Sequence, residues 1–307
     1  MLAIERVGRG VASARAALAG NPSDGYGGAV IAVTLDEFQA RATARAASEA
    51  STSPDSELVG ATVRRFARDH CPDALDVAVE WKTSVPRGVG LGGSSAIVIA
   101  TLRALCELHG VSLERGELAA LALAVEREEL GIAAGLQDRV AQSYGGLTFM
   151  DFGPGGGYEP LNAGLLPPLV VAWRGDTSAD SGVVHGDLRS RFDAGEAAVR
   201  SAMTRLAQLA RDARAGLVRG DHAAFAACVD ASFDARREMM DLDERHVAMI
   251  ERARACGAGA NYTGSGGAIA AVCRGESHRA EVTAALREIG CGTAATGASG
   301  SAAKPGA

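Results

Sequence analysis

The spacing of apolar residues along the chain predicts a mixture of strands and helices. Residues 75–82 alternate as a half-buried strand does, with Val77, Val79 and Trp81 on one face. Residues 57–70 instead repeat their apolar positions at the spacing of an amphipathic helix. The same reasoning predicts strands at 26–35, 146–151, 169–173 and 268–273, a helix carrying Ile97, Val98, Leu102 and Leu105, and helices at 113–130, 137–143, 195–218, 221–237, 243–255 and 277–289.

The stretch GPGGGYEPLNAGLLPP, residues 153–168, interrupts this pattern with glycine and proline. Such clusters mark turns and linkers, so we place a domain boundary there, with one domain at residues 1–155 and a second at 156–291. From residue 292 onward the chain is too poor in large apolar residues to offset the entropy of ordering. The tail at 292–307 is therefore expected to be disordered.

Composition narrows the class of protein. Hydrophobic residues make up 47% of the 307 residues and charged residues 22%, as in ordinary globular proteins. The net charge of −6 and the lack of a dense Lys/Arg stripe argue against nucleic-acid binding. The apolar runs are too short to span a membrane. The six cysteines form neither a CxxC pair nor a zinc-ligand spacing, which predicts a reduced, cytoplasmic protein.

The segment PRGVGLGGSSA, residues 86–96, carries the first candidate chemistry. It lies between a predicted strand and a predicted helix, so its glycines let backbone N–H groups and the helix dipole surround a phosphate. It lacks the Lys of a Walker loop and does not match GxGxxG. The alternative is a glycine turn with a serine cap. The residues expected to contact phosphate are Pro86, Gly88, Gly90, Leu91, Gly92, Gly93, Ser94, Ser95 and Ala96.

Three segments in the same order resemble the GHMP small-molecule kinases. The loop at 86–96 resembles their second motif, with one additional glycine, and residues 263–268 (TGSGGA) resemble the third. The first motif is matched by Arg15-x-x-Leu18-x-Gly20-x-x-Ser23-Asp24, although Asn21-Pro22 replaces Glu-His and the usual Pro-Gly before the arginine is absent. The resemblance implies a two-domain α+β fold with the active site in the cleft between the domains, ATP and Mg²⁺ as cofactors, and a nucleotide site that includes Gly264, Ser265 and Gly266.

The resemblance also assigns catalytic roles. It makes Asp138 the group that accepts or orients the proton of the attacking hydroxyl, with Arg15 beside it to stabilise developing charge. It places Mg²⁺ on Ser95 and Glu126, while Ser94, Glu128 and Glu129 stay open as ligands. The alternative for each acid is a solvated helix face.

For the substrate, the phrases GNPSD, ELGIAAGLQDRVAQSYGGLTFMDF and SADSGVVHGDLRSRF are most similar to those of glucuronokinases, which phosphorylate the anomeric hydroxyl of D-glucuronate. Asp24 would accept hydrogen bonds from sugar hydroxyls, and a buried carboxylate would need a cationic partner such as Arg139, His185 or Arg189. The substrate residues implied are Asn21, Ser23, Asp24, Tyr26, Arg139, Asp180, Ser181 and His185, with Ser178 as a further polar candidate.

Other functions remain open at this level. A GHMP kinase for another small alcohol or sugar, resembling galactokinase or mevalonate kinase, fits the same motifs. A sugar or nucleotide sensor without catalysis would keep the fold, and a dinucleotide-binding dehydrogenase would use the glycine loop alone. We expect a small sugar acid and ATP as partners, and neither nucleic acid nor membrane. The sequence leaves the oligomeric state open.

Overall fold

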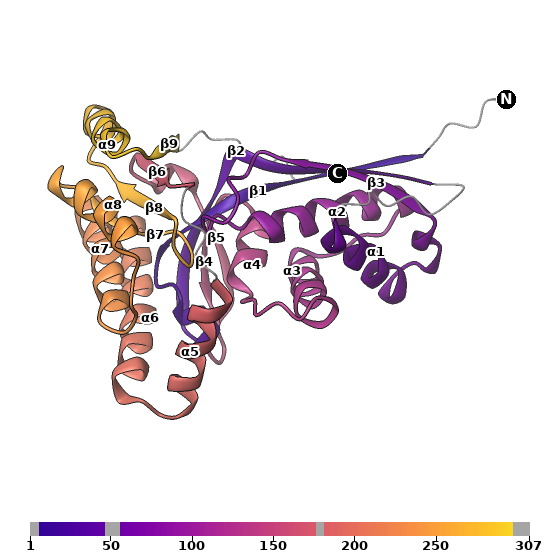
Figure 1. Ribbon diagram of the computed structural model, residues 1–307, viewed down its shortest axis with the longest axis horizontal. Helices are drawn as coiled ribbons and strands as arrows, with labels where there is room; N and C mark the ends of the chain where they lie inside the picture. The colour runs from indigo at the N-terminus through magenta and orange to yellow at the C-terminus, as the bar shows by residue number, and fades with distance from the viewer. Residues whose placement is uncertain (1–5, 47–55, 176–180, 297–307) are drawn as a thin grey trace.

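The computed structural model describes residues 6–46, 56–175 and 181–296, with the backbone alone at 181–186. Two antiparallel sheets with their helices form an elongated α+β molecule (Figure 1). In Figure 1, the long strands β1–β3 and helices α1–α4 occupy one end, and the second sheet with α6–α9 occupies the other. This confirms the expected α+β class.

The first sheet is built around one long strand. Strand β2 (Ala29–Ala46) pairs with β1 (Val7–Ala19) over most of its length. Its two halves take different partners on the other side, because residues 40–46 pair with β3 (Val77–Thr83) and residues 29–33 pair with β4 (Leu147–Asp151). Strand β5 (Tyr158–Leu161) then extends the sheet from β4.

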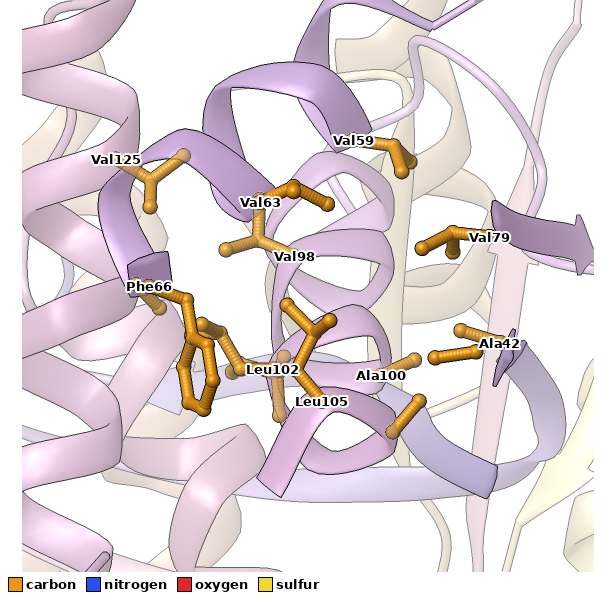
Figure 2. Close-up of a cluster of buried hydrophobic side chains, with 14 of the residues drawn as sticks. Ala42, Val59, Val63, Phe66, Val79, Val98, Ala100, Leu102, Leu105 and Val125 are labelled. Carbon is orange, nitrogen blue, oxygen red and sulfur yellow. The ribbon is translucent and has the colours of Figure 1, made fainter. Parts of the chain in front are cut away.

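Four helices belong to this end of the molecule, and the apolar side chains of the first three form one core with strands β1–β3 (Figure 2), whereas Val140 and Ala141 of the fourth pack in a smaller cluster with Ala17 and Val30. Phe66, Leu102 and Leu105 are fully buried in this core, to which Val79 of β3 also belongs. This is the burial that the helical and alternating patterns of the sequence predict. The helices are α1 (Glu57–Asp69), α2 (Gly93–His109), α3 (Arg115–Ala124) and α4 (Gln137–Tyr144).

Strand β1 was not predicted, and its contact with α2 explains why. A Cβ atom at Gly8 would lie 2.0 Å from the Ala104 carbonyl oxygen, and one at Gly10 would lie 1.9 Å from that of Ala100. The strand and helix therefore meet backbone to backbone, and only glycine fits the inward positions. Because these positions carry no large apolar side chains, the sequence shows no alternation there.

The second sheet has the order β7-β8-β6-β9, with every pair antiparallel. Its fourth strand corrects the expectation of disorder from residue 292, because Gly292–Thr296 pairs with β6 and Cys291 is buried. Residues 297–307 lie outside the described ranges. The strands are β6 (Leu169–Trp173), β7 (Gly259–Tyr262), β8 (Ala268–Val272) and β9 (Gly292–Thr296); the helices are α5 (Ser181–Asp193), α6 (Ala197–Val218), α7 (His222–Arg237), α8 (Glu244–Ala255) and α9 (Glu276–Glu288).

A second core joins the first sheet to the second sheet and its helices. Leu18 and Ile31 of the first sheet are buried together with Leu169 of β6 and Phe225 of α7. The boundary near residue 155 stays a prediction, and β5 belongs to the first sheet although it follows that position. Short helical turns complete the fold: 3-10 turns at Ser23–Tyr26, Pro72–Leu75 and Ala163–Leu165, and a π turn at Val125–Glu129.

No helix among the described residues combines the length and the apolar character needed to cross a bilayer.

Candidate active site

A cavity of about 1120 Å³ collects residues from both ends of the chain. One part of its wall comes from α1, β3 and the start of α2, and includes Leu58, Trp81 and Ile97. The opposite part comes from the 3-10 turn after β1, from α7 and from the loop after β7. A volume of this size holds a drug-sized ligand or two smaller molecules side by side.

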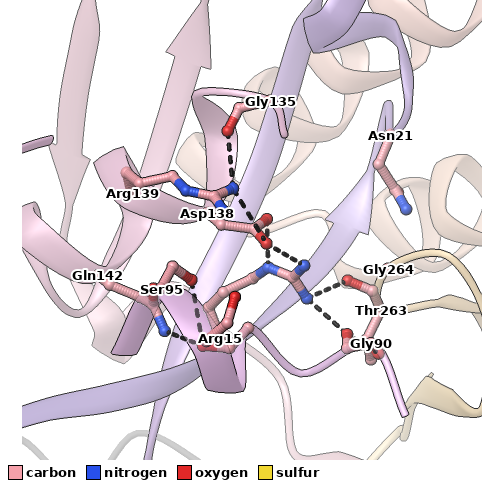
Figure 3. A network of polar contacts seen from close by, with 12 residues as sticks. Arg15, Asn21, Gly90, Ser95, Gly135, Asp138, Arg139, Gln142, Thr263 and Gly264 are labelled. Carbon is pink, nitrogen blue, oxygen red and sulfur yellow. Dashed lines mark hydrogen bonds and ion pairs between the residues drawn. The ribbon is translucent and has the colours of Figure 1, made fainter. Parts of the chain in front are cut away.

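Arg15 of β1 lies at the centre of the polar network in this cavity (Figure 3). Its Nε and Nη2 donate to the two carboxylate oxygens of Asp138, each at 2.7 Å. Its Nη1 donates to the carbonyl oxygens of Gly90 at 2.6 Å and Thr263 at 2.8 Å. A planar guanidinium can make all four contacts at once, and an ammonium cannot. One buried side chain thus joins the three segments predicted to form the site.

The two glycine loops touch through their backbones. Gly90 has a φ of +71°, and a Cβ at Gly264 would lie 2.5 Å from the Gly90 carbonyl oxygen. The Thr263 hydroxyl also donates to that oxygen at 3.0 Å. Neither glycine leaves room for a side chain, so these positions require the residue that the motifs carry.

The loop ends at Gly92, which begins α2 in the left-handed conformation with φ +71°. No side chain caps this helix start, and Gly93 and Ser94 line the cavity. The first N–H groups of a helix, together with its dipole, favour an anion. The serine cap considered from the sequence is therefore not formed here, and the helix start suits a phosphate.

Gln142 supports the same loop and was missed by sequence reasoning. Its Nε2 donates to the carbonyl oxygens of Ser13 at 2.9 Å and Gly92 at 2.8 Å, which ties α4 to β1 and to the start of α2. Gln142 follows Asp138 by four positions, so both side chains share one helix face. That spacing is the signal that could have identified it.

The π turn at Val125–Glu129 separates three neighbouring acids. Glu126 is completely buried, and its carboxylate accepts from the Ser94 hydroxyl at 2.6 Å and from the guanidinium of Arg139. Glu128 and Glu129 instead form ion pairs with Arg65 and Arg68 of α1. Of the three candidates for a metal ligand, only Glu126 therefore lines the cavity.

The donor set at Glu126 can be compared with the needs of a metal ion. The Ser95 hydroxyl, predicted as a ligand, is buried and donates to the Gly92 carbonyl oxygen at 3.1 Å, so Ser94 takes its place beside Glu126. Among the described residues there is no group of three or more His, Cys, Asp or Glu side chains able to hold a metal. One carboxylate and one hydroxyl fit Mg²⁺, which is commonly bound through few protein groups together with phosphate oxygens.

Asp24 lies in the 3-10 turn Ser23–Tyr26, close enough to Asp138 for the two carboxylates to interact. Its Oδ2 faces Gly135 so closely that a Cβ there would lie 2.8 Å away. Burial, and next the negative charge of Asp138, raise the pKa of Asp24 to about 6 from an ordinary 3.8. A half-buried carboxylate without a dedicated ion-pair partner in the described chain is a good acceptor for ligand hydroxyls.

The remaining predicted substrate residues differ in their positions. Asn21 and Tyr26 line the cavity, and Tyr26 packs on Phe192 with Arg189 over its ring. The assignment of Ser23 to the substrate needs correction, because its buried hydroxyl donates to the Ala29 carbonyl oxygen and does not reach the cavity wall.

Arg139 lines the cavity, but its guanidinium is engaged by Glu126 and the Gly135 carbonyl oxygen. Ser181 and His185 lie on α5, where their side chains are not described, and Ser178 and Asp180 lie outside the described residues. Of the predicted nucleotide residues, all line the cavity except Ser95, Ala96 and Gly266.

Arg236 was not considered from the sequence, yet it is 1% exposed and lines the cavity from α7. The Arg-Arg pair at 236–237 has the appearance of a solvated helix surface, which its neighbour Arg237 does occupy. Only the docking of α7 against the loop after β7 distinguishes the two.

Comparisons with known proteins agree with this geometry. Residues 57–146 match the N-terminal domain of GHMP kinases and residues 213–300 match their C-terminal domain. Glucuronokinase 1 of Arabidopsis thaliana is 32% identical over 302 residues, covering 85% of this chain and 83% of that protein. Probable glucuronokinase 2 of the same plant is 34% identical over 304 residues, covering 85% and 82%.

Solved structures of other sugar kinases share the fold. The crystal structure of Lactococcus lactis galactokinase with galactose superimposes with a TM-score of 0.78 at 17% identity, covering 95% of this chain and 93% of that one. At such identity the likeness concerns the fold alone. The sequence matches and the shared fold together show that this chain is a kinase of the GHMP family, with that family's two-domain α+β architecture.

Proposed function

We propose that this kinase transfers the γ-phosphoryl group of ATP to the anomeric hydroxyl of D-glucuronate, giving 1-phosphoglucuronate and ADP. The observation that carries the proposal is the Arg15–Asp138 pair, which lies between the helix start suited to phosphate and the sugar-facing Asp24. The similarity to the two plant glucuronokinases over most of the chain supports the choice of sugar.

ATP fits the cavity wall formed by the first domain. Leu58, Trp81 and Ile97 offer an apolar surface for the adenine ring. The triphosphate would then follow the loop at 88–95 to the N-terminus of α2, where the free N–H groups would donate to phosphate oxygens in place of a side-chain cap.

At the acceptor side, Asp138 would receive the proton of the attacking hydroxyl. Both of its oxygens accept from Arg15, but each carboxylate oxygen has a further lone pair for the sugar. The sugar oxygen forms a bond to the γ-phosphorus while the bond to the bridging oxygen of ADP breaks. Arg15 fixes the orientation of Asp138 and contributes positive charge beside the phosphoryl group.

Ser94 and Glu126 would hold Mg²⁺ at the start of α2. When bound, Mg²⁺ supplies the positive charge that neutralises the β- and γ-phosphate oxygens. Arg139 would orient Glu126 by donating hydrogen bonds to its carboxylate, as the hydrogen-bond partners of metal-binding carboxylates commonly do.

The test is an assay of ADP release with ATP and Mg²⁺ across D-glucuronate, D-galacturonate, glucose, galactose and mevalonate. We expect turnover with glucuronate, and a product whose phosphorus signal is coupled to the anomeric proton. Asp138→Ala should lower kcat by at least about a hundredfold.

Other outcomes identify the competing functions. Preference for a different acceptor would keep the kinase and reject glucuronate. Saturable sugar or nucleotide binding without turnover of any acceptor would identify a sensor. Glu128→Gln serves as the control, since this acid pairs with Arg65 away from the cavity.

A further inference from the structure

Arg236 occupies an unusual position for a cation. Its side chain is almost completely buried, and it lines the cavity near Asn21 and Gly264. Its Nη2 donates to the Gly264 carbonyl oxygen at 2.9 Å and its Nη1 to that of Asn21 at 3.4 Å. Its Nε is buried and has no hydrogen-bond partner among the described residues.

The other cavity arginines have acidic partners or lie in solvent. Arg15 is paired with Asp138 and Arg139 with Glu126, both as buried ion pairs. Arg189 is half exposed, stacks over Tyr26 and reaches Asp193 of its own helix. Within the described chain, Arg236 is thus the buried cavity arginine whose hydrogen bonds go to backbone carbonyls and not to a carboxylate.

A buried guanidinium without an ion-pair partner is costly. Two carbonyl contacts satisfy part of its donors, and the Tyr262 ring at 5.3 Å adds a cation–π contact, but neither neutralises the charge. Burial accordingly lowers the pKa of Arg236 to about 10. An anion that enters the cavity would gain from a cation that is already desolvated and held in place.

The ligand groups that remain for this position follow from the rest of the site. The triphosphate is assigned to the loop at 88–95, and sugar hydroxyls to Asp24, which lies close enough to influence the charge of Arg236. The ligand group that remains is the carboxylate of the acceptor.

We propose that Arg236 binds the carboxylate of the acceptor and thereby makes this kinase selective for sugar acids over neutral sugars. The inference rests on the proposed function, since it deepens the choice of substrate. It replaces Arg139 and Arg189 in that role, because their guanidinium groups are already engaged.

The experiment compares two acceptors on two proteins. D-glucuronamide keeps the shape of D-glucuronate but lacks its charge, so wild type should prefer glucuronate by about a hundredfold in kcat/KM. Arg236→Met should lower kcat/KM for glucuronate by about a hundredfold, mainly through KM. The same variant should change kcat/KM for glucuronamide by less than about fivefold. Arg237→Met is the matched control, because Arg237 neighbours Arg236 on α7 and its exposed side chain pairs with Glu251 of α8.

Arg236→Lys provides a second variant that keeps the charge and loses the planar fork. We expect an intermediate loss on glucuronate, and circular dichroism and thermal unfolding will establish that each variant is folded. If Arg236→Met does not fold, the Lys variant and the wild-type preference between acid and amide carry the test.

Three results would overturn the inference. The first is a wild-type enzyme that accepts glucuronate and glucuronamide equally. The second is an equal loss on both acceptors in Arg236→Met. The third is an increase in KM for ATP with unchanged selectivity, which would assign Arg236 to the phosphates.

Failure of the proposed substrate gives a different result. If wild type phosphorylates another sugar acid, the same comparison applies to that acid and its amide, and a selective loss in Arg236→Met supports the inference although glucuronate is rejected. If wild type uses neutral sugars alone, the inference fails while the kinase activity stands.

Discussion

Arg15 and Asp138 lie 123 residues apart in the sequence and meet through two parallel hydrogen bonds of 2.7 Å. The same guanidinium donates to carbonyl oxygens in both glycine loops. Rotation of either side chain would therefore disturb the phosphate loop, the loop after β7 and the candidate proton acceptor together.

Arg15→Lys should lower kcat by about a hundredfold, because an ammonium cannot hold both oxygens of Asp138 and both carbonyls. The lost charge-assisted hydrogen bonds should also reduce the free energy of unfolding by about 1–3 kcal/mol. Steady-state kinetics and urea unfolding measure the two effects. A kcat within threefold of wild type would contradict the role given to Arg15.

Glu126→Gln should raise the Mg²⁺ concentration for half-maximal activity by about tenfold or more, since the remaining amide is a weaker ligand. It should also destabilise the fold by about 3 kcal/mol, because the buried Arg139 loses its hydrogen-bonded counter-charge and keeps only Asp138 at 3.7 Å. A magnesium titration and urea unfolding provide the measurements. Glu128→Gln should leave the magnesium dependence unchanged, because Glu128 lies in the same turn but pairs with Arg65 and does not line the cavity.

Asp24→Asn should stabilise the folded protein at neutral and higher pH. The pKa of Asp24 is raised to about 6, so its buried charge destabilises the native state above that pH and has no such effect below the ordinary value of 3.8. We expect a gain in the free energy of unfolding of about 1–3 kcal/mol at pH 8, which disappears near pH 4. Urea unfolding at both pH values is the measurement.

The same variant should lose acceptor binding, because an amide oxygen replaces the carboxylate that accepts from the sugar hydroxyls. In wild type, kcat/KM for the acceptor should fall as the pH drops below about 6. A destabilised Asp24→Asn protein at pH 8, or an acceptor KM close to that of wild type, would be inconsistent with this account.

Gly264→Ala should separate the two glycine loops, since its Cβ would lie 2.5 Å from the Gly90 carbonyl oxygen. We expect a rise in KM for ATP of about tenfold or more and a lower melting temperature. Gly220→Ala is the control: Gly220 has φ +72° in the turn between α6 and α7, with no atom within 4 Å of the new Cβ. It should cost about 1 kcal/mol of stability and leave the KM unchanged.

Much of the fold could be predicted from local patterns. The ranges expected for α1, β3 and β4 agree with the structure to within about two residues, because each has an apolar face that is buried, α1 and β3 in one core and β4 in the neighbouring ones. Strands β1 and β9 could not be predicted in this way. Gly8 and Gly10 of β1 meet the backbone of α2, and β9 carries no side chain larger than threonine, so neither segment shows an alternation of large apolar residues.

The candidate site divides in the same manner. Glycine loops are readable as motifs because backbone conformation limits the residue type, and Arg15 and Asp138 were predicted with them. Among neighbouring residues of one type, the resemblance named Glu126 while leaving Glu128 and Glu129 open, and it named Ser95 although Ser94 is the serine that contacts Glu126. Nothing in the sequence separated Arg236 from Arg237. Adjacent residues of one type have the same local propensity, and only the packing around them makes one buried.

The sequence by itself therefore determined the glycine-rich segments that can approach a phosphate, since these depend on residue type and spacing along the chain, and the resemblance carried by those segments implied the family and the α+β class. Only the tertiary structure decided which charges face one another. An ion pair or a buried unpaired guanidinium arises from distances between segments as far apart as residues 15, 138 and 263, and no local pattern records those distances.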